Sequence, residues 1–242
     1  MRRVVFPELL DNDEGTEEEI RQSLDDLRFI NRWFGGTHTT KSMIENVARL
    51  TGRREFSLLE VAAGSGDVPL GAARWLQGRG ITVRVTLLDR AASHLNGAER
   101  NIVSDALALP FRDESFDLVS CGLFAHHLEP DEIVRFLGEG LRVCRVAVVV
   151  NDLRRSPLHL AAVYAGLPLF RSRLTRNDSV VSVRRAYTMA EMRSMMTQTR
   201  AERCDIVPSY LFRMGVIAWK RLPGADAQFR TRDESTSKTK AA

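Results

Sequence analysis

Cysteine, lysine and long apolar runs are all scarce in this chain of 242 residues. Its three cysteines, Cys121, Cys144 and Cys204, have the spacing of neither a disulfide framework nor a zinc site. Such usage is typical of a reducing compartment, so we expect a cytoplasmic location. The longest apolar stretch, residues 158–170, is interrupted by Pro168 and is shorter than a membrane span. We therefore predict no stable insertion into a membrane.

The positive charge of the chain is unevenly spread. The net charge is +4, and only four of the 35 basic residues are lysines. Residues 11–26 hold eight acidic residues and one arginine, whereas residues 142–185 hold nine arginines and two aspartates. A uniformly basic nucleic-acid binder would not show this division, so we predict no nucleic-acid partner. The composition is 44% hydrophobic, which suits one sizeable core, and nothing in it sets an oligomeric state.

Short apolar segments alternate with segments of helical periodicity. Helical patterns separate most of the predicted strands, and this alternation is typical of βαβ units in a parallel sheet. The sequence therefore predicts a Rossmann-like, doubly wound α/β fold, with a mainly parallel seven-stranded sheet closed by an antiparallel hairpin. The predicted strands cover residues 56–61, 81–88, 102–103, 116–120, 146–150, 206–212 and 215–219. The main predicted helices cover residues 17–31, 42–50, 67–78, 130–143 and 187–199.

Acidic residues and glycines gather at the ends of the predicted strands. The first strand ends at Glu60 and runs into a turn containing Gly64 and Gly66, where a backbone without Cβ atoms lets a ligand approach closely. Asp89 ends the second strand, where a carboxylate can accept hydrogen bonds from a ribose diol. Asp105 follows the third strand, where it can accept an adenine amino hydrogen. Since ligands bind at this edge of such sheets, we predict an adenosine-ligand site.

The chemistry of the glycine turn favours a ligand without phosphates. A dinucleotide needs its diphosphate over a helix N-terminus, but Asp67 would place a negative charge there and Glu60 would add to the repulsion. S-adenosylmethionine carries a sulfonium and an ammonium and no phosphate. We therefore predict that S-adenosylmethionine is the cofactor.

Taken together, the segments 59–67, 105–111 and 115–119, with Asp89, resemble the class I S-adenosylmethionine-dependent methyltransferases. Within that class they are most similar to the branch of the ubiquinone/menaquinone and natural-product small-molecule methyltransferases. The turn departs from the commoner pattern, since Glu60 replaces an aspartate and Ala62 and Asp67 replace glycines. The residues that the resemblance places at the cofactor are Glu60, Ala62, Gly64, Gly66, Asp89, Arg90, Asp105, Ala106, Cys121 and Gly122.

Three side chains are candidates for catalysis. His126 and His127 follow the fourth strand, close to the expected methyl group, and an imidazole can take a proton from a phenolic or enolic hydroxyl at neutral pH. The alternative for His127 is to brace the next helix, so His126 is the better candidate base. Asp152, at the end of the fifth strand, either orients the acceptor or caps the following helix.

The resemblance also divides the chain. Residues 1–54 are expected to be N-terminal helices that form part of a lid, residues 55–222 the methyltransferase domain with a lid insertion at about 156–186, and residues 223–242 a disordered tail. The implied function is methyl transfer to oxygen, or to an activated ring carbon, of a small aromatic, quinol or polyketide-type acceptor, with no metal. The alternatives are a nicotinamide-dependent oxidoreductase and a noncatalytic binding protein that retains the cofactor fold.

Overall fold

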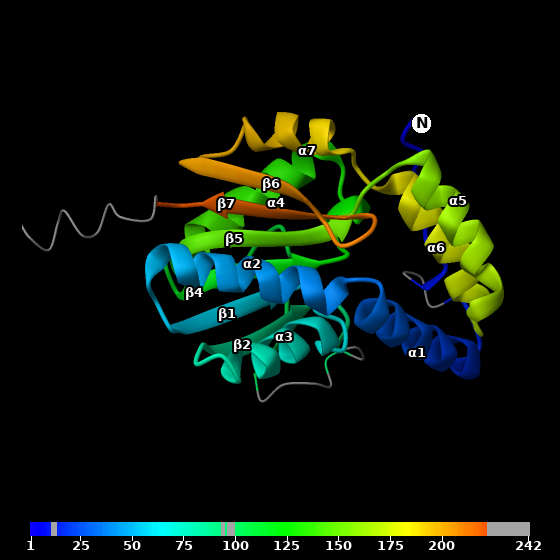
Figure 1. Cartoon of the computed structure of the whole chain (residues 1–242), viewed down its shortest axis with the longest axis horizontal. Coiled ribbons are helices and arrows are strands. Elements are labelled where there is room, and N and C mark those ends of the chain that lie inside the picture. The colour runs from blue at the N-terminus through cyan, green and yellow to red at the C-terminus, as the bar shows by residue number, and fades with distance from the viewer. Residues whose placement is uncertain (11–13, 93–94, 96–99, 222–242) are drawn as a thin grey trace, which may run out of the picture.

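The computed structural model describes residues 1–10, 14–92, 95 and 100–221, and in this part of the chain seven strands form one sheet (Figure 1). The strand order is β3-β2-β1-β4-β5-β7-β6, with β1 to β5 parallel and β6 and β7 antiparallel. The predicted sheet and its closing hairpin are therefore confirmed. The strands are β1 (Glu55–Val61), β2 (Thr82–Asp89), β3 (Asn101–Val103), β4 (Phe116–Gly122), β5 (Cys144–Leu153), β6 (Arg203–Ser209) and β7 (Arg213–Trp219).

Helices cover both faces of this sheet. On one face α2 packs beside α3, and on the other α4 packs beside α7 (Figure 1). The strand order reverses between β1 and β4, and the crevice at such a switch point is where ligands bind in open α/β sheets. The helices are α1 (Glu17–Trp33), α2 (Gly36–Thr51), α3 (Asp67–Gln77), α4 (Pro130–Val143), α5 (Pro157–Gly166), α6 (Arg173–Arg185) and α7 (Met189–Met196), with short 3₁₀ turns η3 (Ala125–His127) and η4 (Leu167–Leu169).

Two apolar clusters hold these layers together. Beneath α2 and α3, Ile44 and Leu76 pack with Phe56 and Trp219 of the sheet. Beneath α4 and α7, Phe136 packs with buried valines of β4 and β5 and buried methionines of α7. Burial of side chains of this size stabilises the fold by about 1.5–3 kcal/mol each. The sheet and its covering helices are thus a rigid base for the loops at the strand ends.

A second group of helices lies beyond the carboxyl ends of the strands. In Figure 1, α1, α5 and α6 lie together at one end of the molecule, and we call them the lid helices. The hydroxyls of Ser23 on α1 and Thr175 on α6 are 3.0 Å apart in a buried hydrogen bond. The two N-terminal helices therefore pack in different places. α1 lies with α5 and α6, whereas α2 buries Ile44 and Val47 against the sheet.

Asp26 attaches α1 to the lid insertion. Its Oδ2 accepts hydrogen bonds from the backbone N–H groups of Arg171 and Ser172, at 2.9 and 3.0 Å, just before α6 begins. We expect Asp26→Ala to leave these two donors unpaired, at about 1–3 kcal/mol each, and to speed amide exchange in α6 at least roughly tenfold. Hydrogen exchange read by mass spectrometry checks this. Asp25→Ala, which removes a half-exposed ion pair with Arg28, is the control, and equal exchange in both variants would contradict the anchoring role.

Some boundaries differ from those expected. The helix predicted from residue 42 begins earlier, because α2 starts at Gly36 after Gly35 takes a left-handed conformation (φ 85°). A side chain at Gly36 would lie within 3 Å of Asn31, so close packing of α1 against α2 sets this start. The last hairpin turns at 210–212 rather than at 213–214, since β6 pairs with β7 from Arg203 to Ser209. Pairing with β7 likewise extends β5 to Leu153.

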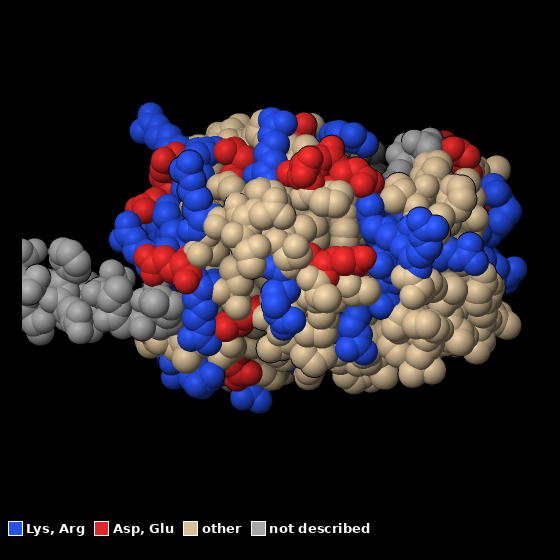
Figure 2. Space-filling view, turned by 90° about the horizontal axis from the view of Figure 1, so that it is seen from above, with Lys and Arg blue, Asp and Glu red and all other residues tan. Residues whose placement is uncertain are grey.

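The surface of the described residues mixes both charges. Figure 2 shows basic and acidic side chains interspersed over the face seen from above, together with uncharged areas over the lid end. Among the described residues, no helix combines the length and apolarity needed to cross a membrane. The expected disordered tail, residues 223–242, lies outside the residues that the structure describes.

Candidate active site

A cavity of about 1100 Å³ lies between the carboxyl ends of the strands and the lid helices. Its sheet side is polar and includes the predicted residues Glu60, Gly64 and Asp89. Its lid side is lined by apolar side chains such as Leu27 of α1 and Val163 of α5. The other predicted cofactor residues that line it are Ala62, Arg90, Asp105, Ala106 and Gly122.

Asp89 fastens the turn after β1 to the end of β2. Its Oδ2 accepts a hydrogen bond from the Gly64 backbone N–H at 2.8 Å, and its Oδ1 accepts one from the Ala91 N–H at 3.0 Å. Each carboxylate oxygen has a second lone pair for a ligand hydroxyl. Asp105 is built in a similar way, with Oδ1 accepting from the Leu107 N–H at 2.8 Å and the side chain exposed to the cavity. The two carboxylates are therefore held in place before any ligand arrives.

Glu60 is the buried acid of the site. It is only 3% exposed, and it accepts hydrogen bonds from the Ser120 hydroxyl and the Gly122 backbone N–H. Burial raises the pKa of Glu60 to about 7, although both hydrogen bonds lower it. No cation of the described residues is among the causes of this shift. A carboxylate in such a place is ready to stabilise a cation that enters the cavity.

Three predicted site residues do not line the cavity. Gly66 begins α3 in a left-handed conformation and faces Leu87, so it shapes the turn without bordering the cavity. The Cys121 side chain is buried in the apolar core beneath α4, because alternate side chains of a strand point to opposite faces of the sheet. Asp152 is 1% exposed and binds His126, so it neither reaches an acceptor nor caps α5, whose cap is Ser156.

The structure places the two histidines in different surroundings. His126 is 2% exposed, with Nδ1 2.7 Å from Asp152 Oδ1 and Nε2 3.5 Å from Glu8 Oε1. Burial alone would lower the pKa of His126, but the two carboxylates raise it to about 10. The two carboxylates favour the protonated imidazole, a form that does not accept a proton, so these surroundings do not favour His126 as the base. His127 is the more exposed of the pair, and its ring lies parallel to that of Phe124 at the cavity wall.

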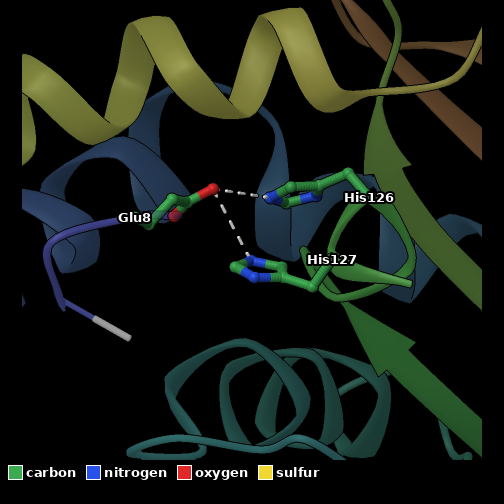
Figure 3. Close-up of side chains that lie close together, drawn as sticks. All are labelled: Glu8, His126 and His127. Carbon is green, nitrogen blue, oxygen red and sulfur yellow. Dashed lines mark ion pairs between the residues drawn. The ribbon is translucent and has the colours of Figure 1, made fainter. Parts of the chain in front are cut away.

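Glu8 and Arg28 line the cavity, although the sequence does not predict them as site residues. Glu8 reaches the cavity from the N-terminal segment, where its Oε1 faces both histidines and accepts a hydrogen bond from Ser182 at 2.7 Å (Figure 3). Arg28 reaches from α1 to Asp67 at the start of α3, at 3.2 Å. Neither residue belongs to a local motif, and both act on residues far away in the sequence. No local signal could have identified them.

Comparisons with known proteins agree with this architecture. A family model described as a methyltransferase domain matches residues 59–149. A ubiquinone/menaquinone biosynthesis C-methyltransferase from Methylobacterium nodulans is 34% identical over 121 residues, which are 45% of this chain and 46% of that protein. The chain thus matches less than half the length of this curated relative.

Solved structures show the same fold. A plantazolicin methyltransferase in complex with a triazolic desmethylPZN analogue and SAH superposes with a TM-score of 0.63, at 12% identity, over 84% of this chain and 91% of that chain. A SAM-dependent methyltransferase from Aquifex aeolicus gives a TM-score of 0.52, at 18% identity, over 73% and 89%. The predicted resemblance is confirmed: residues 59–149 match a methyltransferase domain, within a chain that has the fold of solved S-adenosylmethionine-dependent methyltransferases.

Proposed function

We propose that this protein binds S-adenosylmethionine at the carboxyl ends of its strands and transfers the methyl group to a small acceptor beneath the lid helices. The acceptor atom is oxygen, or an activated ring carbon, of an aromatic, quinol or polyketide-type molecule. The observation that carries the proposal is the single cavity of about 1100 Å³, which has carboxylates on its sheet side and apolar side chains on its lid side. This volume exceeds that of a typical single-ligand pocket, so it accommodates a cofactor and an acceptor together.

The sheet side supports a cationic cofactor. Glu60, Asp67, Asp89 and Asp105 all line it, and Arg28, which lines the same cavity, is paired with Asp67. A diphosphate on this turn would meet Asp67 at the N-terminus of α3, the position that a dinucleotide needs for its phosphates. A sulfonium and an ammonium meet no such repulsion. The carboxylate of Asp89 suits the ribose diol of both S-adenosylmethionine and a dinucleotide. The glycine turn after β1 is therefore the part of the site that discriminates between the two ligands.

The lid side supports an apolar acceptor. Leu24, Leu27 and Ile30 of α1 and Phe170 before α6 line this part of the cavity. Apolar walls exclude water and hold the acceptor in line with the sulfonium, and positioning of this kind supplies much of the acceleration of a methyl transfer. Two similar proteins, a ubiquinone/menaquinone biosynthesis C-methyltransferase and a plantazolicin methyltransferase, are consistent with a small-molecule acceptor.

We expect S-adenosylmethionine to bind in calorimetry and NADH not to bind. Asp89→Asn is expected to weaken cofactor binding about ten- to hundredfold, because each charge-assisted hydrogen bond to a ligand hydroxyl contributes about 1.5–3 kcal/mol. Asp113→Asn, which alters an exposed partner of Arg142 away from the cavity, is the matched control and should bind normally.

Methyl transfer is then measured with labelled S-adenosylmethionine and a panel of phenols and quinols, and we expect label in at least one of them. Binding of NADH without binding of S-adenosylmethionine would support the oxidoreductase alternative and overturn the proposal. Cofactor binding without transfer to any acceptor would favour the noncatalytic alternative.

A further inference from the structure

Glu8, His126 and His127 bring three metal-ligating side chains to one point on the cavity wall. Glu8 Oε1 lies 3.5 Å from His126 Nε2 and 3.7 Å from His127 Nε2, and the three ligand atoms all lie within 4.8 Å of one another. Glu8 comes from the N-terminal segment and the two histidines from η3, so the cluster closes a contact across more than a hundred residues (Figure 3). All three residues line the cavity.

We propose that Glu8, His126 and His127 form a binding site for a divalent metal ion, with zinc the best match, whose open coordination position faces the cavity. Two histidines and one glutamate are a ligand set that catalytic zinc sites use, with a fourth position left for water or substrate. This proposal is independent of the sequence prediction, which expected no metal.

Two of the three separations between ligand atoms are close to those of a zinc site, and the third is within 4.8 Å. Zinc–nitrogen and zinc–oxygen bonds of about 2.0–2.1 Å in a tetrahedral site place neighbouring ligand atoms about 3.3–3.4 Å apart. The separations of 3.5 and 3.7 Å from Glu8 therefore need to shorten by only a few tenths of an ångström. A rotation of the half-buried His127 ring would bring the two imidazoles together.

Outer partners already orient the ligands. The Asp152 carboxylate lies 2.7 Å from His126 Nδ1 and also accepts the His126 backbone N–H at 2.9 Å, which directs Nε2 toward Glu8. Such a carboxylate–histidine pair is the usual second layer of a zinc site, where it fixes the ring and increases its basicity. Ser182 holds Glu8 Oε1 in the same way, through a hydrogen bond of 2.7 Å.

The local charge suits a cation at this point. Without an ion, the carboxylates of Glu8 and Asp152 share the proton of His126, and a metal ion would displace this proton on binding. The positive group nearest Glu8 on α6 is Arg185, whose Nη1 lies 4.0 Å from Glu8 Oε1 while its Nη2 donates to the His127 carbonyl at 3.2 Å. Arg185 and Arg3 both donate to backbone carbonyls here, Arg185 to that of His127 and Arg3 to those of His126 and Leu128.

A metal here would change the chemistry assigned to the histidines. Resting on the proposed function, the open position would take an acceptor hydroxyl and lower its pKa, so that its proton would pass to solvent water and the oxygen would be ionised without an imidazole base. The ion would be held at the wall of the cavity that the acceptor shares with the cofactor.

The test uses the full chain, freed of metal with a chelator, and zinc as the only added ligand. We expect one zinc ion per chain in a competition titration with a chromophoric chelator, and cobalt to give the visible absorption of a four-coordinate site. His127→Asn should weaken zinc binding at least tenfold, and Asp152→Asn by about ten- to hundredfold. His159→Asn is the matched control, since His159 lines the same cavity outside the cluster and should leave zinc affinity unchanged.

Two results would overturn the proposal. One is zinc binding that is substoichiometric, and the other is zinc binding of equal strength in wild type and in His127→Asn with native circular dichroism. In either case the cluster is a proton-sharing contact that fastens the N-terminal segment. S-adenosylmethionine affinity measured on the same metal-free samples tests the proposed function separately, because Glu60, Asp89 and Asp105 bind no part of this cluster.

Discussion

Replacing Glu60 with glutamine is expected to weaken S-adenosylmethionine binding about ten- to hundredfold and to abolish its pH dependence below pH 8. The loss has the size of one buried contact between a carboxylate and a cation, about 1.5–3 kcal/mol. In the wild type the pKa of Glu60 is about 7 when the cavity is empty. A cationic cofactor favours the ionised carboxylate, so binding at lower pH must first remove the proton.

Affinity for S-adenosylmethionine should therefore fall as the pH is lowered. Above about pH 8 Glu60 is ionised and affinity is at its plateau, whereas at pH 6 only about a tenth of the protein has the charged form, so the dissociation constant rises about tenfold. Cys121, the titratable neighbour of Glu60, does not contribute in this range, because burial raises the pKa of its thiol well above its usual value. Calorimetry between pH 5.5 and 8 measures the profile.

The stability of the cofactor-free fold should fall as the pH rises, whereas the affinity for the cofactor rises. Because the pKa of Glu60 is higher in the folded than in the unfolded protein, the protonated carboxyl stabilises the fold at low pH, and this contribution is lost as the pH rises toward 7. The change from 4.5 to about 7 corresponds to about 3 kcal/mol. Glu60→Gln should therefore melt at a higher temperature than the wild type at pH 8 without cofactor.

A matched variant sharpens this test. Ser120→Ala removes the hydroxyl that donates to Glu60 and so should raise the pKa of the carboxyl, which moves the midpoint of the binding profile to higher pH. A profile that is flat in the wild type, or unchanged in Ser120→Ala, would contradict the role of Glu60 as the acid beneath the cofactor.

The sheet and its polar edge were predictable because local patterns determine them. The strands ending at Glu60 and Asp89 are apolar runs that close in acidic residues, and parallel strands bring their carboxyl ends to one edge whatever the details of packing. The predicted residues Glu60, Gly64, Asp89 and Asp105 accordingly line one cavity. The order of strands and helices along the chain is nearly sufficient to predict which residues lie at this edge of the sheet.

The roles of individual side chains depended on contacts between distant segments. His126 has the chemistry of a base, yet Asp152 and Glu8 on either side hold a proton on it. The approach of Glu8 depends on the N-terminal segment crossing α6, where Asp178 accepts the backbone N–H groups of Leu9 and Leu10 at 2.9 and 3.0 Å. Single-sequence patterns carry no information on such crossings, so they predict which residues lie at the sheet edge but not which distant side chains contact them there.

Substitution of Gly66 by alanine is expected to destabilise the fold by about 2–5 kcal/mol. Gly66 has φ 73°, and a left-handed conformation costs a residue with a Cβ about 1–2 kcal/mol. An added Cβ would lie 2.5 Å from Leu87 Cδ1 and 3.3 Å from Leu70 Cδ1. Leu87 is fully buried in the sheet, so the strain of overpacking adds about 1–3 kcal/mol. Chemical denaturation measures the loss.

Alanine substitutions at two other left-handed glycines distinguish the cost of backbone strain from the cost of crowding by neighbouring side chains. Gly80 (φ 71°) is exposed and Gly64 (φ 51°) lines the cavity, and a Cβ on either meets no atom within 4 Å. Gly80→Ala should therefore cost only the conformational strain of about 1–2 kcal/mol. Gly64→Ala should cost no more than that, yet its methyl group projects toward the cofactor and should weaken S-adenosylmethionine binding about tenfold or more. If Gly66→Ala were no less stable than Gly80→Ala, contact with Leu87 would not be what requires a glycine there. If Gly64→Ala bound the cofactor normally, the methionine part would not pass over this turn. The two glycines of one motif thus serve different ends, one the packing of the sheet and the other the approach of the ligand.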